Sequence, residues 1–363
     1  MPMQAVEDVD DAYRATKALL WPIDRTTWLK LAVVVLFVAG PGGGFSGAQT
    51  SAPTNAGVPG GGPRAPGAVR PPVALGGAEW LVIGAIVGVV LLLVLGALFV
   101  GSVMEFVLVE SLRTETVSLR TYWGRRWRQG LRLFGFRIVL GLLGLGSLAG
   151  VAGLVILPIA FDGGMGVTVP VLALLLLLPV LAVVGIVTGI VDGFTTVFVV
   201  PVMIHEERPL LGAWGRLWSS IVDHPWQYLT YVVVSVVLSL VGGVVAALAV
   251  GVLAVALLVP FGLLAIAGVL VATALEPLGI GIVVLTAVLF GLALIAGAAV
   301  VQVPVVVYLR YYALLVLGDV EESVDLIADR RAAVRATDGG SAPDGDDGDA
   351  GDIGAEADDG DEP

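Results

Sequence analysis

The chain has 363 residues, of which 57% are apolar and 14% charged, with a formal net charge of -12 and no cysteine. This balance excludes an ordinary water-soluble domain, in which about 25% of residues are charged. The lack of cysteine also excludes disulfides, thiolate metal sites and a cysteine nucleophile. The sequence therefore predicts an all-α fold, a polytopic transmembrane helix bundle.

Residues 1–26 are expected to form a cytoplasmic, amphipathic N-terminal segment, and the first apolar run occupies residues 27–44. A signal peptide competes for this run, because its length and the small residues around Ala48 fit cleavage. The four acidic residues among the first eleven are unusual in front of a signal peptide, so we favour a retained span. Residues 41–79, rich in Gly and Pro, are then an extracellular loop.

Five further apolar runs are long enough to cross a hydrocarbon core of about 30 Å at a rise of about 1.5 Å per residue. The six predicted spans are residues 27–44, 80–109, 133–160, 170–204, 228–259 and 278–317, within a transmembrane domain of residues 27–318. The stretch from Tyr228 to Leu275 is ambiguous, since it could hold two spans. It could equally hold one span followed by a re-entrant helix at residues 260–277, beginning at Pro260.

The placement of basic residues decides between six and seven spans, because short cytoplasmic loops retain positive charge. The segment from Ser111 to Arg137 carries seven arginines and is expected inside. With six spans, 17 of the 19 basic residues lie inside, whereas seven spans would export those after residue 329. We therefore predict a multi-pass protein of the cell membrane with both termini in the cytoplasm.

The C-terminal part after the last span is polar. Residues 319–337 are predicted to form a cytoplasmic helix, and residues 338–363 a disordered acidic tail. Eleven of the 31 acidic residues follow Thr337, which leaves 20 acidic residues against 19 basic ones in the rest of the chain. A Gly/Asp/Ala-rich tail buries too little apolar surface to offset its ordering entropy. The low isoelectric point is therefore a property of the tail.

An internal repeat is visible in the rarer residues. The pattern F-V-x-x-V-M ends the second and fourth predicted spans, at residues 99–104 and 198–203, and W-G-R-x-W follows at residues 123–127 and 214–218. These matches predict about six spans arranged as three hairpin-like repeats, joined by cytoplasmic amphipathic linkers.

The tryptophan motifs predict a lipid-facing surface. Tryptophans four residues apart share a helix face, indoles prefer the headgroup layer, and arginines can meet lipid phosphates. The candidate lipid-interface residues are Trp123, Arg125, Arg126, Trp127, Arg128, Trp214, Arg216 and Trp218. The alternative is that this segment is only a positive-inside loop with an aromatic belt, as membrane proteins of any function have.

Asp192 is the acidic residue that lies well inside an apolar run, and an acid within a membrane span is a functional candidate by default. With Thr188, Thr195 and Thr196 it is the candidate intramembrane polar site, which would bind a proton or a cation. The alternative is that its span is tilted or kinked, so that Asp192 reaches water near the inner end.

No other pattern indicates chemistry. His205 and His224 lack the spacing of a metal motif, and there is neither a Walker lysine motif nor a nucleophile elbow. We therefore expect no enzyme activity, no catalytic residue, no metal, no cofactor and no nucleic-acid partner.

The tryptophan repeats, the long Val/Leu/Gly spans and the Asp/Gly tail resemble an uncharacterised family of haloarchaeal multi-pass membrane proteins, over most of residues 1–329. More loosely, the plan of hairpins and linkers is similar to the membrane domain of some bacterial glycerophosphodiester phosphodiesterases. The catalytic barrel of that family needs clustered carboxylates and histidines, for which this chain has no room. The resemblance thus implies membrane embedding and lends no activity.

The leading hypothesis is an uncharacterised, non-catalytic scaffold or subunit that works with membrane lipid, with a membrane-protein partner or as a homo-oligomer. The alternative is a secondary transporter or channel that uses Asp192 in a polar intramembrane site, motivated by the repeats and by proline-broken spans.

Overall fold

The computed structural model describes residues 4–39, 77–161 and 168–339, and the regular structure in these ranges is helical throughout. The all-α prediction is confirmed for them. The elements are α1 (Gln4–Leu20), α2 (Arg25–Val38), α3 (Gly77–Thr114), α4 (Leu119–Phe161), α5 (Thr168–Phe194), a π-helix (Thr195–Val199), α6 (Val200–Glu206), α7 (Leu210–Asp223), α8 (Pro225–Ala272), α9 (Glu276–Val320), a 3₁₀ turn (Glu322–Val324) and α10 (Ala328–Gly339).

Five helical segments among the described residues are long and apolar enough to cross a membrane. They are Trp80–Thr114, Leu119–Leu154, Leu175–Glu206, Pro225–Ala272 and Glu276–Val320. The chain is therefore built as a multi-pass membrane protein, as its composition predicted. Five segments meet these criteria where six spans were expected.

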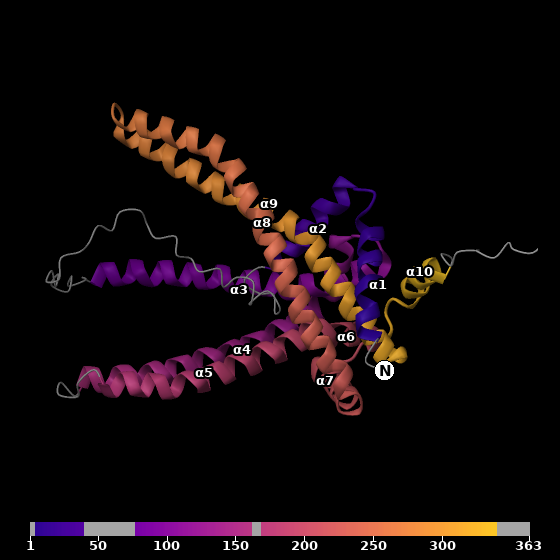
Figure 1. Ribbon diagram of the computed structural model, residues 1–363. Coiled ribbons are helices and arrows are strands. Elements are labelled where there is room, and N and C mark those ends of the chain that lie inside the picture. The colour runs from indigo at the N-terminus through magenta and orange to yellow at the C-terminus, as the bar shows by residue number, and fades with distance from the viewer. Residues whose placement is uncertain (1–3, 40–76, 162–167, 340–363) are drawn as a thin grey trace, which may run out of the picture.

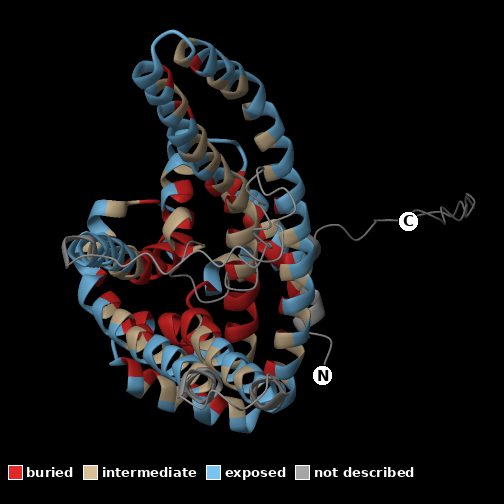
Figure 2. Ribbon diagram, turned by 90° about the vertical axis from the view of Figure 1, so that its left-hand side faces the viewer, coloured by how far each residue is buried: buried red, intermediate tan, exposed pale blue. Residues whose placement is uncertain are grey.

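The molecule divides into three arms and a hub (Figure 1). The arms are residues 80–98 of α3, residues 138–161 of α4 with residues 168–191 of α5, and residues 244–300 from α8 and α9. They fan out from one region, in which the remaining described residues pack together as the hub. Figure 2 shows the buried residues gathered in the hub, whereas the arms are largely exposed.

The arms have the length and composition of membrane spans. Residues 80–104 and 138–161 contain no charged side chain. At about 1.5 Å per residue, 24 helical residues measure about 36 Å, which exceeds a hydrocarbon core of about 30 Å. Exposed Leu, Val and Ile side chains cover the arms, and such a surface is stable only against lipid or another apolar surface.

The first predicted span, residues 27–44, is not among the five. The helix found there, α2, has 14 residues and is capped by Asp24, whose carboxylate accepts the backbone N–H of Thr27 at 2.9 Å. Its length of about 21 Å is too short to cross a bilayer alone. Its buried face, which includes Leu31 and Val35, packs against α9 and α3. Residues 40–44 lie outside the described residues.

The prediction of a separate re-entrant helix at residues 260–277 is wrong. Helix α8 continues through Pro260 to Ala272, a three-residue turn follows, and α9 begins at Glu276. Packing between α8 and α9 overrides the loss of one backbone hydrogen bond at proline. Beyond Pro260 the rings of Phe261 and Phe290 meet edge to face, with centroids 5.8 Å apart.

The linkers differ from one another. The first, at residues 119–132, is continuous with the following apolar run within α4, so no helix boundary separates it from the span predicted to start at residue 133. The second is the separate helix α7, which ends before Pro225 opens α8. Where one helix was predicted at residues 319–337, α9 runs on to Val320 and is followed by the 3₁₀ turn and α10, and their cytoplasmic location stays a prediction. Most of the acidic tail, from residue 340 on, lies outside the described residues.

Candidate functional site

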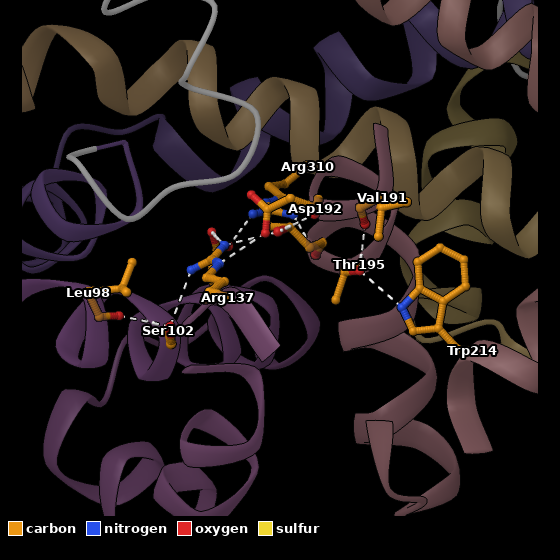
Figure 3. Close-up of polar contacts among 10 residues, drawn as sticks. Leu98, Ser102, Arg137, Val191, Asp192, Thr195, Trp214 and Arg310 are labelled. Atoms are coloured by element: carbon orange, nitrogen blue, oxygen red, sulfur yellow. Dashed lines mark hydrogen bonds and ion pairs between the residues drawn. The ribbon is translucent and has the colours of Figure 1, made fainter. Parts of the chain in front are cut away.

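The candidate site lies where the charge-free parts of the helices end. Glu105 of α3, Arg137 of α4, Asp192 of α5 and Arg310 of α9 are each the first charged residue on the hub side of a long apolar run. Although they are far apart in the sequence, they meet in one cluster at the base of the arms, part of which is drawn in Figure 3. We call these four residues the ion cluster.

Arg137 is the centre of the ion cluster. Its Nη2 donates to Glu105 Oε1 at 3.3 Å and to Thr196 Oγ1 at 2.9 Å. Its Nε donates to Asp192 Oδ1 at 3.3 Å, and its Nη1 to Ser102 Oγ at 3.4 Å. One guanidinium thus ties α4 to α3 and α5, because its planar fork presents donors in several directions.

Arg310 completes the cluster from α9. It forms an ion pair with the second carboxylate oxygen of Glu105, and its Nη1 donates to the backbone carbonyl of Thr196 at 2.8 Å. Glu105 therefore lies between two guanidinium groups, with 1% of its side chain exposed. Two carboxylates and two guanidiniums balance in charge, which a buried cluster requires.

A π-helical turn supplies one of these contacts. In an α-helix the N–H of Val200 would bond to the carbonyl of Thr196, but here it bonds to that of Thr195. The carbonyl of Thr196 is thereby free to accept Arg310. Pro201 follows directly and has no N–H to donate, which weakens the α-helical register at this point.

The structure brings together part of the predicted polar site. Asp192 has 21% of its side chain exposed and pairs with Arg137. Thr196 joins the cluster through its side chain and its carbonyl. Thr195 instead accepts the indole N–H of Trp214 at 3.0 Å, and Thr188 bonds within its own helix to Val184 O at 2.7 Å.

Sequence reasoning missed three members of the ion cluster. Glu105 and Arg310 were not singled out from the sequence as candidate site residues, and Arg137 was counted only among the seven arginines of the segment from Ser111 to Arg137. One signal was available, because each of the three bounds a long charge-free run. That rule would have grouped them with Asp192, although it could not have told which residues pair.

A second buried ion pair lies deeper in the hub. Arg126 Nη2 donates to Glu110 Oε2 at 2.9 Å, and each side chain is 4% exposed. Arg126 also donates to Gln129, whose amide donates to the carbonyl of Met203 at 3.0 Å. The prediction that Arg126 faces lipid is therefore wrong, because its charge is used to join α3 to α4.

The two tryptophan motifs adopt a related arrangement. The first tryptophan of each packs on the hub, since Trp123 meets Phe99 edge to face at 6.1 Å and Trp214 donates to Thr195. The second tryptophan is exposed, by 42% for Trp127 and 62% for Trp218. The predicted lipid-interface set thus contains both packing residues and surface residues.

The arginines of the two motifs also differ. Arg125 and Arg128 are exposed, and Arg128 lies over the ring of Trp127 at 5.6 Å from its centroid. Arg216 is held in the hub, where it pairs with Glu206 and Glu321. The prediction of a lipid-facing Arg216 is therefore not supported by its contacts.

A third charged cluster joins the two ends of the described chain. Arg335 of α10 pairs with Asp8 at 3.1 Å and Asp11 at 3.0 Å on α1, and with Asp319 at 2.8 Å at the end of α9. Burial, together with the neighbouring carboxylate of Asp319, raises the pKa of Asp8 to about 7 although Arg335 opposes the shift. Helices α1 and α10 therefore lie at the same end of the molecule.

Comparison with known proteins gives a family and no function. The chain belongs to the family of unknown function DUF7544, whose model matches residues 3–327. No curated protein and no solved structure matches the chain. The expected resemblance to an uncharacterised family is therefore confirmed in its coarse form. The haloarchaeal source and the likeness to glycerophosphodiester phosphodiesterases stay predictions.

Proposed function

We propose that this protein is a non-catalytic membrane scaffold or subunit, whose hub holds three apolar arms in place for lipid or protein partners. The observation that carries the proposal is the contrast between the ion cluster and the arms. Glu105, Arg137, Asp192 and Arg310 neutralise one another and join four helices. The arms themselves offer the bilayer bare apolar surface.

The bare faces include close-approach sites for other helices. A Cβ added at Gly84 or Gly88 of α3 would meet nothing within 4 Å, and the same is true of Gly185 and Gly189 of α5. Glycines four residues apart let membrane helices pack closely. Lipid or a second membrane protein must cover these faces, so we place the partners at the arms.

We further propose that both chain ends lie in the cytoplasm and that the chain crosses the cell membrane six times. The ion pairs between α1 and α10 support this, because two helices that touch lie on the same side of a membrane and an even number of crossings lies between them. Five long segments are described, so the sixth crossing would begin with α2. Because the chain has no native cysteine, a single cysteine at Ser341 tests this. It should resist an impermeant maleimide on intact cells, whereas one at Ser51 should react.

Site-specific photocrosslinking in cells tests the scaffold proposal. A photoreactive residue at Leu92, 70% exposed on the α3 arm, should capture a stoichiometric membrane protein or a lipid. The matched control is the same residue at Leu108, fully buried in the hub on the same helix, which should capture only the chain itself. Equal capture at both positions, or none at several arm positions, would contradict the proposal.

The second candidate function is a secondary transporter or channel. The π-helical turn beside Asp192 favours it, because such turns are frequent at functional sites, and Asp192 is the least buried carboxylate of the ion cluster. Proteoliposomes with a pH-sensitive dye inside should then show proton uptake that Asp192→Asn abolishes while the variant stays folded. Absence of uptake under both inward and outward pH gradients would remove proton coupling from consideration.

A further inference from the structure

Three exposed arginines on α4, which we call the arginine stripe, take no part in the ion pairs that hold the hub together. Seven arginines of the hub each pair with a carboxylate, namely Arg126, Arg137, Arg216, Arg310, Arg330, Arg331 and Arg335. By contrast, Arg125, Arg128 and Arg132 of α4 are exposed and, among the described residues, form no ion pair with a carboxylate. Three guanidiniums side by side without counter-charge attract an anion.

These arginines share one face of α4. They stand at positions i, i+3 and i+7, which lie above one another on a helix. Arg126, one position along, lies on the opposite, buried face and pairs with Glu110. The helix thus keeps its structural arginine inside and presents the other three outward.

The same face continues directly into the membrane arm. Val139 and Leu143, at i+14 and i+18 from Arg125, are 64% and 59% exposed. Gly135, between the arginines and this apolar part, has open space where a Cβ would stand. An acyl chain lying along Val139 and Leu143 would therefore reach the arginines without crossing a side chain at residue 135.

The Arg132 end of the stripe lies nearest the headgroup layer, and Arg125 lies about 20 Å of helix from Ile138, so the stripe meets this layer along a helix tilted toward the membrane surface. The charge-free run of α4 begins at Ile138, and Arg132 precedes it by six residues, or about 9 Å of helix. The polar layer of one leaflet is about 5–8 Å thick. The half-exposed indole of Trp127 lies under Arg128, as expected for a side chain at the interface.

We propose that Arg125, Arg128 and Arg132 bind the phosphate group of anionic phospholipids, whose acyl chains lie on the same face of α4 beside Val139 and Leu143. The proposal rests on the lipid partner named under the proposed function and specifies its chemistry. Arginine presents paired N–H donors that match phosphate oxygens. A base near an anionic membrane surface contributes about 1 kcal/mol, so each arginine should strengthen binding by about fivefold.

Native mass spectrometry of the full chain in a mild non-ionic detergent tests this. The protein is mixed with equal amounts of phosphatidylglycerol and phosphatidylcholine that have identical acyl chains. The wild-type protein should retain phosphatidylglycerol in preference to phosphatidylcholine. In Arg125→Gln/Arg128→Gln/Arg132→Gln this preference should fall by at least about tenfold. Inorganic phosphate at the same concentration should compete poorly, because it lacks the acyl chains; equal competition would identify a site for free phosphate instead.

A charge-matched control removes three bases elsewhere. Lys17→Gln/Arg25→Gln/Lys30→Gln lowers the net charge by the same amount on α1 and α2 and should keep the preference. Arg125→Lys/Arg128→Lys/Arg132→Lys keeps the charge that orients the helices and should insert normally with most of the preference retained. If the triple glutamine variant does not fold, Arg128→Gln alone should weaken the preference by about fivefold.

Other outcomes would overturn the proposal. If the glutamine and control variants lose the preference equally, only net charge matters. If wild type shows no preference but retains an acidic polypeptide that the triple glutamine variant loses, the stripe docks a protein. A failed lipid experiment leaves the photocrosslinking result at Leu92 unaffected, so the two proposals fail separately.

Discussion

The hub and the arms are built for different surroundings, although several helices contribute to both. In α4, Arg126 and Arg137 are buried in ion pairs, while Val139 and Leu143 a few residues later are exposed. The hub has the buried core and paired charges of a water-soluble domain. The arms have the reverse, an apolar exterior that only a bilayer can cover.

The difference shows where the fold is specified. Lipid tails are as apolar as leucine, so no hydrophobic driving force pulls the arms together. In the hub, by contrast, Glu105 fixes α3, α4 and α9 relative to one another through two guanidiniums. The arrangement of the arms therefore depends on contacts at their base, and substitutions in the two regions should differ sharply in effect.

The largest effect is expected at the centre of the ion cluster. Glu105→Gln keeps the side-chain shape but removes the carboxylate partner of Arg310, leaving a buried charge unpaired. Breaking one partner of a buried pair costs about 3–5 kcal/mol. Thermal unfolding of the detergent-solubilised protein should show it, whereas Glu207→Gln, at an exposed carboxylate, should change little.

A double variant separates charge pairing from other causes. Glu105→Gln combined with Arg310→Met removes both charges, so it should be more stable than Glu105→Gln alone. If the loss of stability in the double variant equals the sum of the losses in Glu105→Gln and in Arg310→Met alone, the pairing of these residues does not stabilise the hub. The contrast between hub and arms would then fail.

A second comparison uses two glycines of one helix. At Gly130, in the hub, an added Cβ would lie 2.9 Å from the backbone Cα of Val103, whereas at Gly141, in the arm, it would meet nothing within 4 Å. Gly130→Ala should therefore destabilise the protein by about 1–3 kcal/mol. Gly141→Ala should be neutral or slightly stabilising, since alanine favours helix. Equal melting shifts would show that the arm is packed as tightly as the hub.

The class of fold could be read from the sequence because it depends on local properties. Long apolar runs predict spans wherever they occur, and α3, α4, α5, α8 and α9 follow them. The break predicted at Pro260 did not occur, because pairing of α8 with α9 offsets a missing hydrogen bond. Local signals therefore predict helix existence better than helix ends.

The candidate site was only partly predictable. Asp192 could be found because an acid inside an apolar run is rare. Its partner Arg137 is 55 residues away, and Thr196 contributes a carbonyl that only the π-helical turn makes available. The relative orientation of side chains on α4 could have been derived from the sequence, since Arg126, Gly130 and Arg137 share a helix face. The linker and the span were predicted as separate elements, however, whereas they form one helix.

A smaller effect is expected from pH at the contact of α1 with α10. The pKa of Asp8 is about 7 in the folded protein against an ordinary value of 3.8, so the folded state binds more protons between these values. Stability should therefore fall as pH rises from about 4 to 7, by on the order of 2 kcal/mol after allowing for the coupling to Asp319. Limited proteolysis of α1 across this range reports the change.

The matched variants at this contact lie on the same helix. Asp8→Asn should remove the pH dependence and make α1 equally protected at pH 5 and pH 8. Asp10→Asn changes an exposed carboxylate that forms an ion pair with Arg14, and should leave the dependence intact. A dependence that survives in Asp8→Asn would assign it to another group.

The smallest effect distinguishes the two tryptophans of the second motif. Trp214→Phe keeps an aromatic ring but loses the hydrogen bond to Thr195 Oγ1, so it should destabilise the hub by about 0.5–1.5 kcal/mol. Trp218 is 62% exposed, so Trp218→Phe should not change the melting temperature in detergent. In lipid nanodiscs the difference in melting temperature between the two variants should become smaller. Trp218→Phe should then also be destabilising, because an indole at the headgroup layer gains contacts that phenylalanine cannot make. If Trp218→Phe behaves identically in detergent and in nanodiscs, α7 does not rest on the membrane surface, and the region in contact with the bilayer is confined to the arms and α4.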